Sequence, residues 1–234
     1  MSLFHTTQWS LVLGAADDQG RPALEALCRA YRPPVLAYIR HLGYSREDAE
    51  DLAQEFFLHF LEGDIARRAD PQRGRFRSYL LTILRHSLAT AHARAGAAKR
   101  GGQLQVRRLD DVDPAEVAAS DERESRGPER AFELSWAITV LERATQALAE
   151  EARRDGKAEL FAQLRPCLIE APDEDDYRRL AQALGLRRNT LAVAVHRLRQ
   201  RLRDKVRAEL LDTLADPDLV EDELRHLRQS LSAM

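Results

Sequence analysis

Three carboxylates in the segment SREDAEDLAQEFFLHFLEG, residues 45–63, have the spacing of one helix face. Asp48, Asp51 and Glu55 are three and four residues apart, and the apolar residues of the segment fall on the opposite side. Paired carboxylates serve acid–base catalysis or bind metals. A metal site, however, needs ligands that converge from several elements, and the nearby His59 has no second ligand at such a spacing. We therefore interpret this face as an acidic docking surface for a basic partner.

The segment 177–206 has the pattern of two helices joined by a tight turn at Gly185, where glycine permits a backbone conformation that other residues resist. In the second helix, apolar residues recur at intervals of four, three and four and define one buried stripe: Leu191, Val195, Leu198 and Leu202. The opposite face then carries Asn189, Ala192, Val193, His196 and Gln200, flanked by Arg188, Arg197, Arg199 and Arg203.

These residue types fit DNA. Arginine and asparagine bond base edges, alanine and valine contact the thymine methyl group, and further arginines hold phosphates without reading sequence. The pattern predicts a helix-turn-helix with an outward-facing recognition helix. The alternatives are a helical hairpin in a protein that does not bind DNA and, for His196, an ordinary surface position.

Charge is sorted into blocks along a chain whose net charge is only −2. Residues 71–109 hold nine Lys and Arg and no acid, and residues 110–133 hold nine acids against three Arg. Residues 177–208 hold ten Lys and Arg against one acid, and residues 209–234 hold seven acids against two Arg. Two separated cationic surfaces indicate a polyanion bound in two places; the alternative is that the arginines form solvated faces.

Composition excludes several classes of protein. Of the 234 residues, 44% are hydrophobic, 32% are charged and 6% are aromatic, which favours helices over β-sandwiches. The two cysteines, Cys28 and Cys167, exclude a disulfide scaffold and a cysteine-rich zinc site. No apolar run approaches the ~20 residues that cross a bilayer, and the first residues lack the basic region of a signal peptide. We expect a cytoplasmic protein without membrane insertion.

Helical periodicity dominates the chain. Residues 22–41 are expected to form two short helices or one broken helix, because Pro33 and Pro34 interrupt the pattern. The other expected elements are a helix over 46–62 capped by Ser45, a loop over 63–74, a long helix over 73–96, a linker over 96–128, a helix from Arg130, a short helix with Leu160, Phe161 and Leu164, an acidic loop over 170–176 and a last helix beginning at Asp216–Pro217.

The prediction is an all-α protein with two helical domains joined by a flexible linker, the second containing the helix-turn-helix. The expected boundaries are residues 1–98 for the first domain, 99–129 for the acidic linker, 130–208 for the second domain and 209–234 for a C-terminal amphipathic helix.

The segments DAEDLAQEFF and RGRFRSYLLTILRHSLA, then a linker, then the helix-turn-helix resemble in this order the bacterial alternative sigma factors of the extracytoplasmic-function (ECF) group, two-domain members of the sigma-70 family. The resemblance covers residues 20–100 and 130–207. It implies that the acidic helix binds the clamp helices of the largest subunit of core RNA polymerase. The residues that would make this contact are Asp48, Asp51, Gln54 and Glu55.

The resemblance also implies two contacts with promoter DNA. The helix after the acidic one would bind and open the minus-ten element, which needs cations for phosphates and a pocket for an unstacked base. Its candidates are Arg73, Arg75, Phe76, Arg77, Tyr79, Arg85, His86, Arg94, Lys99 and Arg100, with core packing as the alternative for Phe76 and Tyr79. The helix-turn-helix would read the minus-thirty-five element and rest on the flap of the second-largest subunit. Its candidates are Arg187, Arg188, Asn189, Thr190, Ala192, Val193, His196, Arg197, Arg199 and Arg203.

The chain departs from the family pattern in several places. Arg187 stands where a serine-type cap is frequent, Ala192 where a base-reading residue is common, and His86 where asparagine is usual. The acidic linker either mimics a nucleic-acid strand in a basic channel or is a solvated tether. The tail over 209–234 either packs on the second domain, which we favour, or covers a basic surface by charge attraction.

The resemblance implies an alternative sigma factor that gives core RNA polymerase its promoter recognition and starts transcription, with no enzymatic activity and no cofactor. Its expected partners are core RNA polymerase, promoter DNA, and an anti-sigma factor or another regulator. Two other classes remain. A stand-alone helix-turn-helix regulator would leave residues 45–100 unexplained, and an adaptor that binds acidic proteins would show no salt-sensitive DNA affinity.

Overall fold

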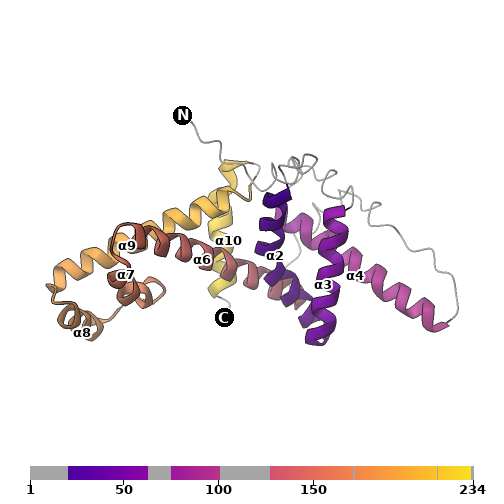
Figure 1. Cartoon of the computed structure of the whole chain (residues 1–234), viewed down its shortest axis with the longest axis horizontal. Helices are drawn as coiled ribbons and strands as arrows, with labels where there is room; N and C mark the ends of the chain where they lie inside the picture. The colour runs from indigo at the N-terminus through magenta and orange to yellow at the C-terminus, as the bar shows by residue number, and fades with distance from the viewer. Residues whose placement is uncertain (1–20, 63–74, 101–126, 171, 215, 233–234) are drawn as a thin grey trace. The chain divides into compact units, whose positions relative to one another are not determined.

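The computed structural model describes residues 21–62, 75–100, 127–170, 172–214 and 216–232. Over these residues the chain forms helices and no strand, which confirms the all-α prediction (Figure 1). In chain order the elements are α2 (Arg21–His41), α3 (Arg46–Glu62), α4 (Phe76–Arg100), α6 (Pro128–Arg154), α7 (Ala158–Leu164), the 3-10 helix η3 (Arg165–Leu168), α8 (Glu174–Leu184), α9 (Arg188–Leu211), the 3-10 helix η4 (Pro217–Leu219) and α10 (Val220–Ser232). The expected loop over 63–74 and most of the expected linker lie outside the described residues.

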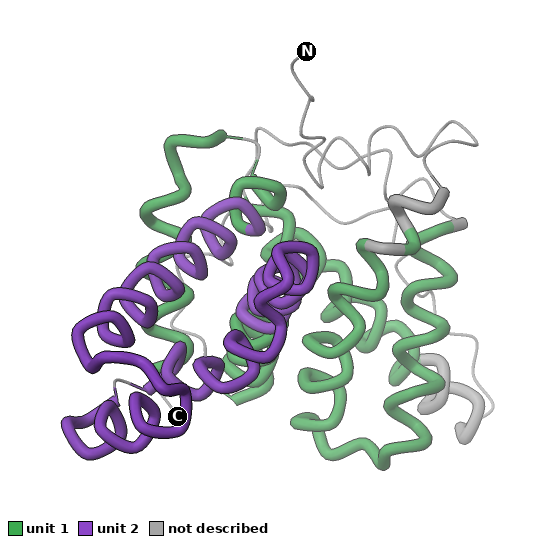
Figure 2. The backbone as a smooth tube through the Cα atoms, turned by 60° about the vertical axis from the view of Figure 1, so that its left-hand side comes forward, with its two compact units in different colours: residues 1–139, 210–234 green, residues 140–209 purple. Residues whose placement is uncertain are grey.

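The chain divides into two compact units (Figure 2). Unit 1 comprises residues 1–139 and 210–234, and unit 2 comprises residues 140–209. Helix α10, the last in the sequence, therefore belongs to the same unit as α2, α3 and α4. The functional boundaries expected at residues 98, 129 and 208 stay a prediction. Across the described helices, none is long and apolar enough to span a membrane.

Helix α2 runs without a break through Pro33 and Pro34, so the expected interruption was wrong. Each proline lacks an N–H donor and crowds the preceding turn, at a cost of about 3 kcal/mol in a helix interior. Packing on both sides of the prolines offsets this cost, because Tyr31, Val35 and Ile39 are 2%, 0% and 0% exposed. Burial of one continuous stripe thus outweighs the local preference of the sequence.

Helices α3 and α4 complete the core of unit 1 around α2. The Ser45 hydroxyl accepts a hydrogen bond from the backbone N–H of Asp48 at 3.1 Å and donates one to its carboxylate at 2.7 Å, so α3 begins where the sequence predicts. The Phe76 ring, at the start of α4, lies 5.2 Å from the Tyr31 ring and 6.4 Å from the Phe60 ring, measured between centroids. These edge-on aromatic contacts join all three helices.

Unit 2 is built around a smaller core, in which Leu164, Cys167, Leu191 and Val195 are buried together. These residues come from α7, η3 and α9, and apolar side chains of α8 pack against them. The stripe predicted for α9 from its four–three spacing is therefore the side that this core buries.

Helix α8 has sharply defined ends. The Asp173 carboxylate accepts the Asp176 N–H at 2.7 Å, and the Asp176 carboxylate accepts the Asp173 N–H at 3.2 Å. The second half of the expected acidic loop is thus the first turn of a helix, where carboxylates stabilise the positive end of the helix dipole. At the other end Gly185 has φ of 63°, and its N–H bonds the carbonyls of Ala181 and Gln182. The predicted turn before α9 is confirmed.

Candidate functional site

The outer side of α9 carries side chains that solvent can reach. Asn189, Val193, His196 and Gln200 share one face of the helix and are exposed, Val193 to 49%. The opposite side is closed, with Leu191 fully buried. The face therefore offers an amide, a branched apolar group and an imidazole to a partner, types that contact base edges and the thymine methyl group. For these four residues the outward orientation predicted from the sequence is confirmed, whereas Ala192, predicted on the same face, is half-buried.

Arg188, at the start of α9, is held by α8 rather than pointing freely outward. Its Nε donates to Glu174 Oε1 at 2.7 Å, a second guanidinium nitrogen contacts Oε2, and the guanidinium carbon lies 5.6 Å from the centre of the Tyr177 ring. The bonds from Arg188 lower the pKa of Glu174 and raise that of Arg188 itself. Both side chains are at least half exposed, so this pair adds little stability and leaves Arg188 able to exchange Glu174 for another acceptor.

The remaining cations of α9 have different surroundings. Arg199 is half-buried and donates to the backbone carbonyls of Cys167 at 2.7 Å and Glu170 at 2.6 Å, so in this structure it anchors η3 instead of offering its donors to phosphate. Arg203 is exposed and donates to Gln200 at 3.0 Å. Three other predicted contacts are exposed: Arg187, Thr190 and Arg197. Ala192 is half-buried.

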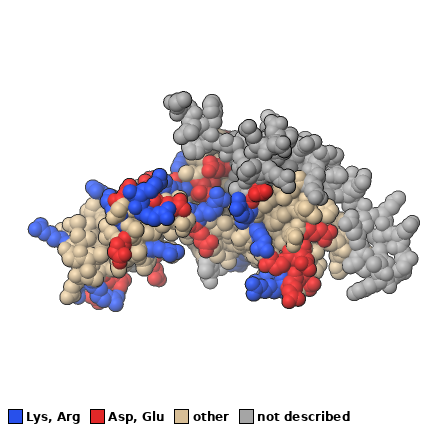
Figure 3. All heavy atoms as spheres, in the orientation of Figure 1, with Lys and Arg blue, Asp and Glu red and all other residues tan. Residues whose placement is uncertain are grey.

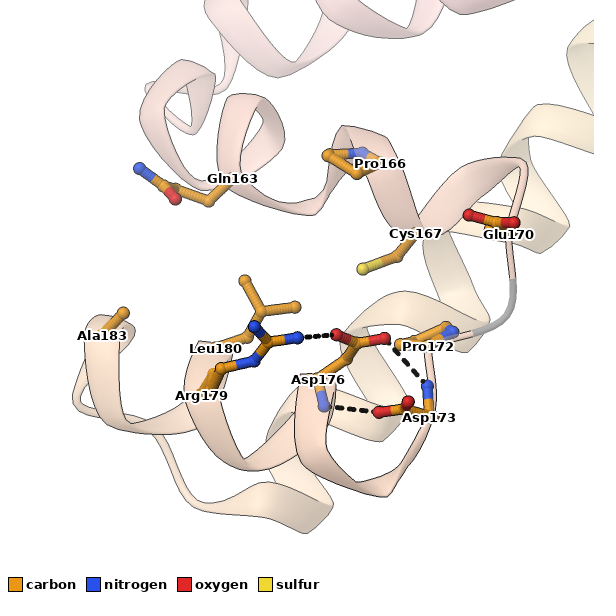
Figure 4. A pocket seen from close by; sticks show the side chains of 10 residues that line it. All are labelled: Gln163, Pro166, Cys167, Glu170, Pro172, Asp173, Asp176, Arg179, Leu180 and Ala183. Carbon is orange, nitrogen blue, oxygen red and sulfur yellow. Dashed lines mark hydrogen bonds and ion pairs between the residues drawn. The ribbon is translucent and has the colours of Figure 1, made fainter.

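A groove of about 700 Å³ lies between η3 and α8 within unit 2 (Figure 4). The Cys167 sulfur and the Leu180 side chain point into it, and Arg179 and Asp176, paired at 2.5 Å, stand at its edge. Burial raises the pKa of the Cys167 thiol, which keeps it neutral and makes it part of an apolar wall. A groove with an apolar floor and a charged edge suits an amphipathic segment of another protein.

The predicted docking face on α3 is open to solvent. Asp48, Asp51, Gln54 and Glu55 are exposed, and Figure 3 shows acidic side chains gathered over this helix. Among the described residues, the carboxylates of this face bond only Ser45, at the start of the helix. The side chains that the structure describes include no group of three or more His, Cys, Asp or Glu able to hold a metal.

Two leucines that the sequence reasoning missed extend the same face. Leu58 and Leu61 are 50% and 39% exposed. Leu58 follows Asp51 by seven residues, and Leu61 follows Gln54 by seven, so both leucines stand two turns above the polar residues on the same side. The sequence contained a signal for their exposure, because Leu58 and Leu61 lie outside the apolar stripe formed by Phe56 and Phe60. The face is therefore acidic at one end and apolar at the other.

The candidates for the minus-ten contact are spread over very different environments. Phe76 is 0% exposed and belongs to the core of unit 1. Tyr79 and His86 are half-buried, and Arg85 is exposed and lies 3.8 Å from Glu129. Arg73 lies outside the described residues. The side chains of three further candidates in α4 are likewise not described: Arg94, Lys99 and Arg100.

Arg77 is a buried cation, which the sequence did not predict. Its side chain is 4% exposed, its Nε lies 2.9 Å from Glu133 Oε2, and its guanidinium carbon lies 4.4 Å from the centre of the Trp136 ring. Another nitrogen contacts Glu223, whose side chain is fully buried. Burial alone would lower the pKa of Arg77, but the two carboxylates outweigh it and raise that pKa. In this conformation neither Phe76 nor Arg77 is accessible to DNA.

The same ion pairs correct the favoured expectation for the tail. We expected it to pack on the second DNA-binding domain, whereas Glu223 of α10 pairs with Arg75 and Arg77, and His226 Nε2 lies 3.0 Å from Glu133 Oε2. All of these residues belong to unit 1. The start of the tail helix was predicted correctly, since the carboxylate of Asp216 accepts the backbone N–H of Asp218 at 2.9 Å.

The two missed carboxylates left a signal in the sequence. Glu223 lies three residues after Val220 and four before Leu227, within the apolar stripe of its helix, and Glu133 follows Phe132 in the buried part of α6. A carboxylate at an apolar position of an amphipathic helix indicates a buried cation, because an unpaired buried charge is very costly.

Comparison with known proteins gives one match. Residues 27–97 match the family model described as Sigma-70 region 2, which spans most of α2, all of α3 and nearly all of α4. The match covers less than a third of the chain and includes none of unit 2. No curated protein and no solved structure matches the chain. The match supports a sigma-70 family member, and with it a sigma-factor role in promoter recognition by RNA polymerase.

Proposed function

We propose that the chain is an alternative sigma factor of the ECF group, which brings core RNA polymerase to particular promoters through its own DNA contacts. The observation that carries this proposal is the match of residues 27–97 to Sigma-70 region 2, because the matched stretch includes the exposed acidic face of α3. The exposed side of α9, in a different compact unit, supports a second DNA contact.

The face of α3 is the proposed contact with polymerase. Asp51 and Glu55 would pair with cations of the partner, while Leu58 and Leu61 would be buried against its apolar side chains. Charge complementarity mainly sets the association rate and orientation, and burial of apolar area supplies much of the affinity. A positively charged helical surface on the polymerase fits this combination.

The face of α9 is the proposed reader of the upstream promoter element. Asn189, Val193 and His196 would lie against base edges in the major groove, and Arg197 would hold a phosphate. Arg188 would leave Glu174 when DNA offers a stronger acceptor, because a well-placed bidentate contact to guanine is charge-assisted and specific. The groove between η3 and α8 is the proposed site for the polymerase flap.

Run-off transcription with purified core polymerase and a genomic promoter library tests the function directly. We expect the chain to start transcription at a small set of promoters that share two sequence elements. Transcription no higher than with core polymerase alone would refute the proposal. Specific, tight binding to duplex DNA in the absence of polymerase, together with no transcription, would identify a stand-alone helix-turn-helix regulator instead.

Charge reversals test the docking face. Asp51→Arg and Glu55→Arg should weaken capture by immobilised core polymerase and leave the helical circular dichroism unchanged, because both side chains are exposed. Glu150→Arg, at an exposed position of α6, is the matched control and should bind as the wild type does. Equal capture of all three variants would show that α3 is not the contact.

Base reading has its own test in competition transcription. Asn189→Ala should relax the preference at one position of the upstream element by about 1–3 kcal/mol, the value of one good base contact. Arg178→Ala, at an exposed residue of α8 that pairs with Asp175, is the control and should leave the ranking of promoters intact. An unchanged ranking for Asn189→Ala would remove α9 as the reader.

A further inference from the structure

Helix α10 places a carboxylate on the arginines at the start of α4. Glu223 lies on the apolar side of α10 with Val220 and Leu227, and its side chain is fully buried. Its Oε1 lies 2.5 Å from the Nε of Arg75, and its Oε2 contacts a terminal nitrogen of Arg77. One carboxylate from the end of the chain thus engages two cations that lie nearly 150 residues earlier.

A second carboxylate completes the enclosure of Arg77. Glu133 of α6 accepts from the Nε of Arg77, and Trp136, one turn later in α6, covers the guanidinium face. His226 of α10 then contacts Glu133, so α6 and α10 are joined to each other as well as to α4. The edges and one face of the Arg77 guanidinium are therefore occupied by protein groups.

The enclosure balances charge. Two guanidinium groups meet two carboxylates, so Arg75 and Arg77 contribute no net positive charge to the surface while α10 is in place. Arginine binds carboxylates and phosphates with the same fork of N–H donors. The position that Glu223 occupies is consequently one that a phosphate oxygen could take.

We propose that α10 is an intramolecular competitor of nucleic acid, and that its Glu223 carboxylate occupies a phosphate site formed by Arg75 and Arg77. Nucleic acid reaches these arginines only after α10 has left them. The inference rests on the proposed function, since it assigns a regulated state to the cationic face of the Sigma-70 region 2 stretch.

The tail has the properties of a releasable element. Helix α10 is 13 residues long, and isolated helices of ~12–15 residues are marginal in water, so its helical state depends on the surface beneath it. A buried ion pair loses much of its attraction to the cost of desolvation. The tail is acidic, with seven acids against two arginines over residues 209–234, so a nearby polyanion repels it while attracting the arginines.

The test is the salt dependence of binding of the full chain to a fluorescent DNA duplex of random sequence. Glu223→Gln should steepen the slope of log affinity against log salt by about one, because Arg75 loses its carboxylate while Glu133 stays on Arg77, and each phosphate contact contributes about 0.9 to that slope. Asp222→Asn is the matched control, because it removes the same charge from the neighbouring position. Asp222 is exposed, and its one ion pair within the described residues is with Arg225 of the same helix. The control should keep the wild-type slope.

A double variant tests whether an increase in the salt slope comes from the arginines. Arg75→Gln combined with Glu223→Gln should lose most of the added slope, because the cation freed by Glu223→Gln is gone. Equal slopes for Glu223→Gln and Asp222→Asn would overturn the proposal.

Hydrogen exchange on the wild-type chain provides a measurement without mutation. Saturating duplex DNA should raise the exchange rate of the amides of residues 220–232, because α10 loses the surface that keeps it helical. Undiminished protection of α10 in the DNA complex would also overturn the proposal.

The two proposals fail separately. A chain that starts transcription but shows no change in slope retains its sigma function and loses the competitor. A chain that does not start transcription but shows the steeper slope for Glu223→Gln retains the competitor, now as the control of a DNA-binding protein of another kind.

Discussion

Removal of the Arg77 guanidinium should be among the most damaging single changes in unit 1. Its side chain is 4% exposed, lies against Glu133 and Glu223, and covers Trp136 at 4.4 Å. Arg77→Ala would leave two buried carboxylates without their common cation. Breaking a buried pair in this way costs about 3–5 kcal/mol. At about 2–4 °C per kcal/mol for a chain of this size, the melting temperature should fall by about 6–20 °C.

Urea unfolding followed by the fluorescence of Trp136 measures this loss. The chain has a second tryptophan, Trp9, so the series is made in a Trp9→Phe background in which Trp136 is the sole reporter. Arg85→Ala is the matched control, because Arg85 lies in the same helix and pairs with Glu129 at 3.8 Å, but is 41% exposed. An exposed pair of this kind is worth about 0–1 kcal/mol.

The size of the effect of a second substitution gives the sharpest test. Glu223→Gln should lower stability more when Arg77 is present than in the Arg77→Ala background, where Glu223 keeps Arg75 as its only cation among the described residues. The reasoning is refuted if Arg77→Ala costs no more than Arg85→Ala, or if Glu223→Gln has the same effect in both backgrounds.

Three further outcomes follow from the structure. Gly185→Ala should lower the free energy of unfolding by about 1–2 kcal/mol, because alanine is strained at φ of 63°; an unchanged urea midpoint would contradict this. Burial by itself would raise the pKa of Glu133, but its cationic partners outweigh burial, and the pKa of the folded state is lowered. The stabilisation by the ionised carboxylate is therefore complete above the pKa of the unfolded state, near 4.5. It is lost as the pH falls through the lower pKa of the folded state. The stability gap between the wild type and Glu133→Gln should therefore close below about pH 4.5, and a constant gap would count against this pairing. Arg199→Ala should free the carbonyls of Cys167 and Glu170 and speed hydrogen exchange of the amides of residues 165–170, and an equal exchange rate would show that Arg199 does not anchor η3.

Local pattern was enough to predict the recognition-helix candidate. The apolar spacing of α9 places Leu191 and Val195 on the buried side of the helix. Helix geometry alone then places Asn189 and Val193 on the outward side. Gly185 could be assigned for the same reason, since a left-handed turn favours glycine whatever surrounds it. In each case the deciding interactions lie within a few residues of one another.

Local pattern failed where distant segments decided the outcome. Pro33 and Pro34 predict a break, yet α2 is continuous because the stripe formed by Tyr31, Val35 and Ile39 is buried by the core of unit 1. The energy that offsets the prolines comes from α3 and α4, and periodicity within α2 does not reveal it.

The sequence by itself determined that the described parts of the chain are helical, that α3 presents carboxylates and that α9 presents an amide, a branched apolar group and an imidazole on its exposed side. Each follows from residue type and a repeat of three or four positions. Only the tertiary structure decided which cations are available. Arg75 and Arg77 belong to a run of positive charge in the sequence, but Glu133 and Glu223, brought from two later helices, neutralise them. Coulombic pairing depends on distance in space, and the order of residues along the chain does not contain that distance.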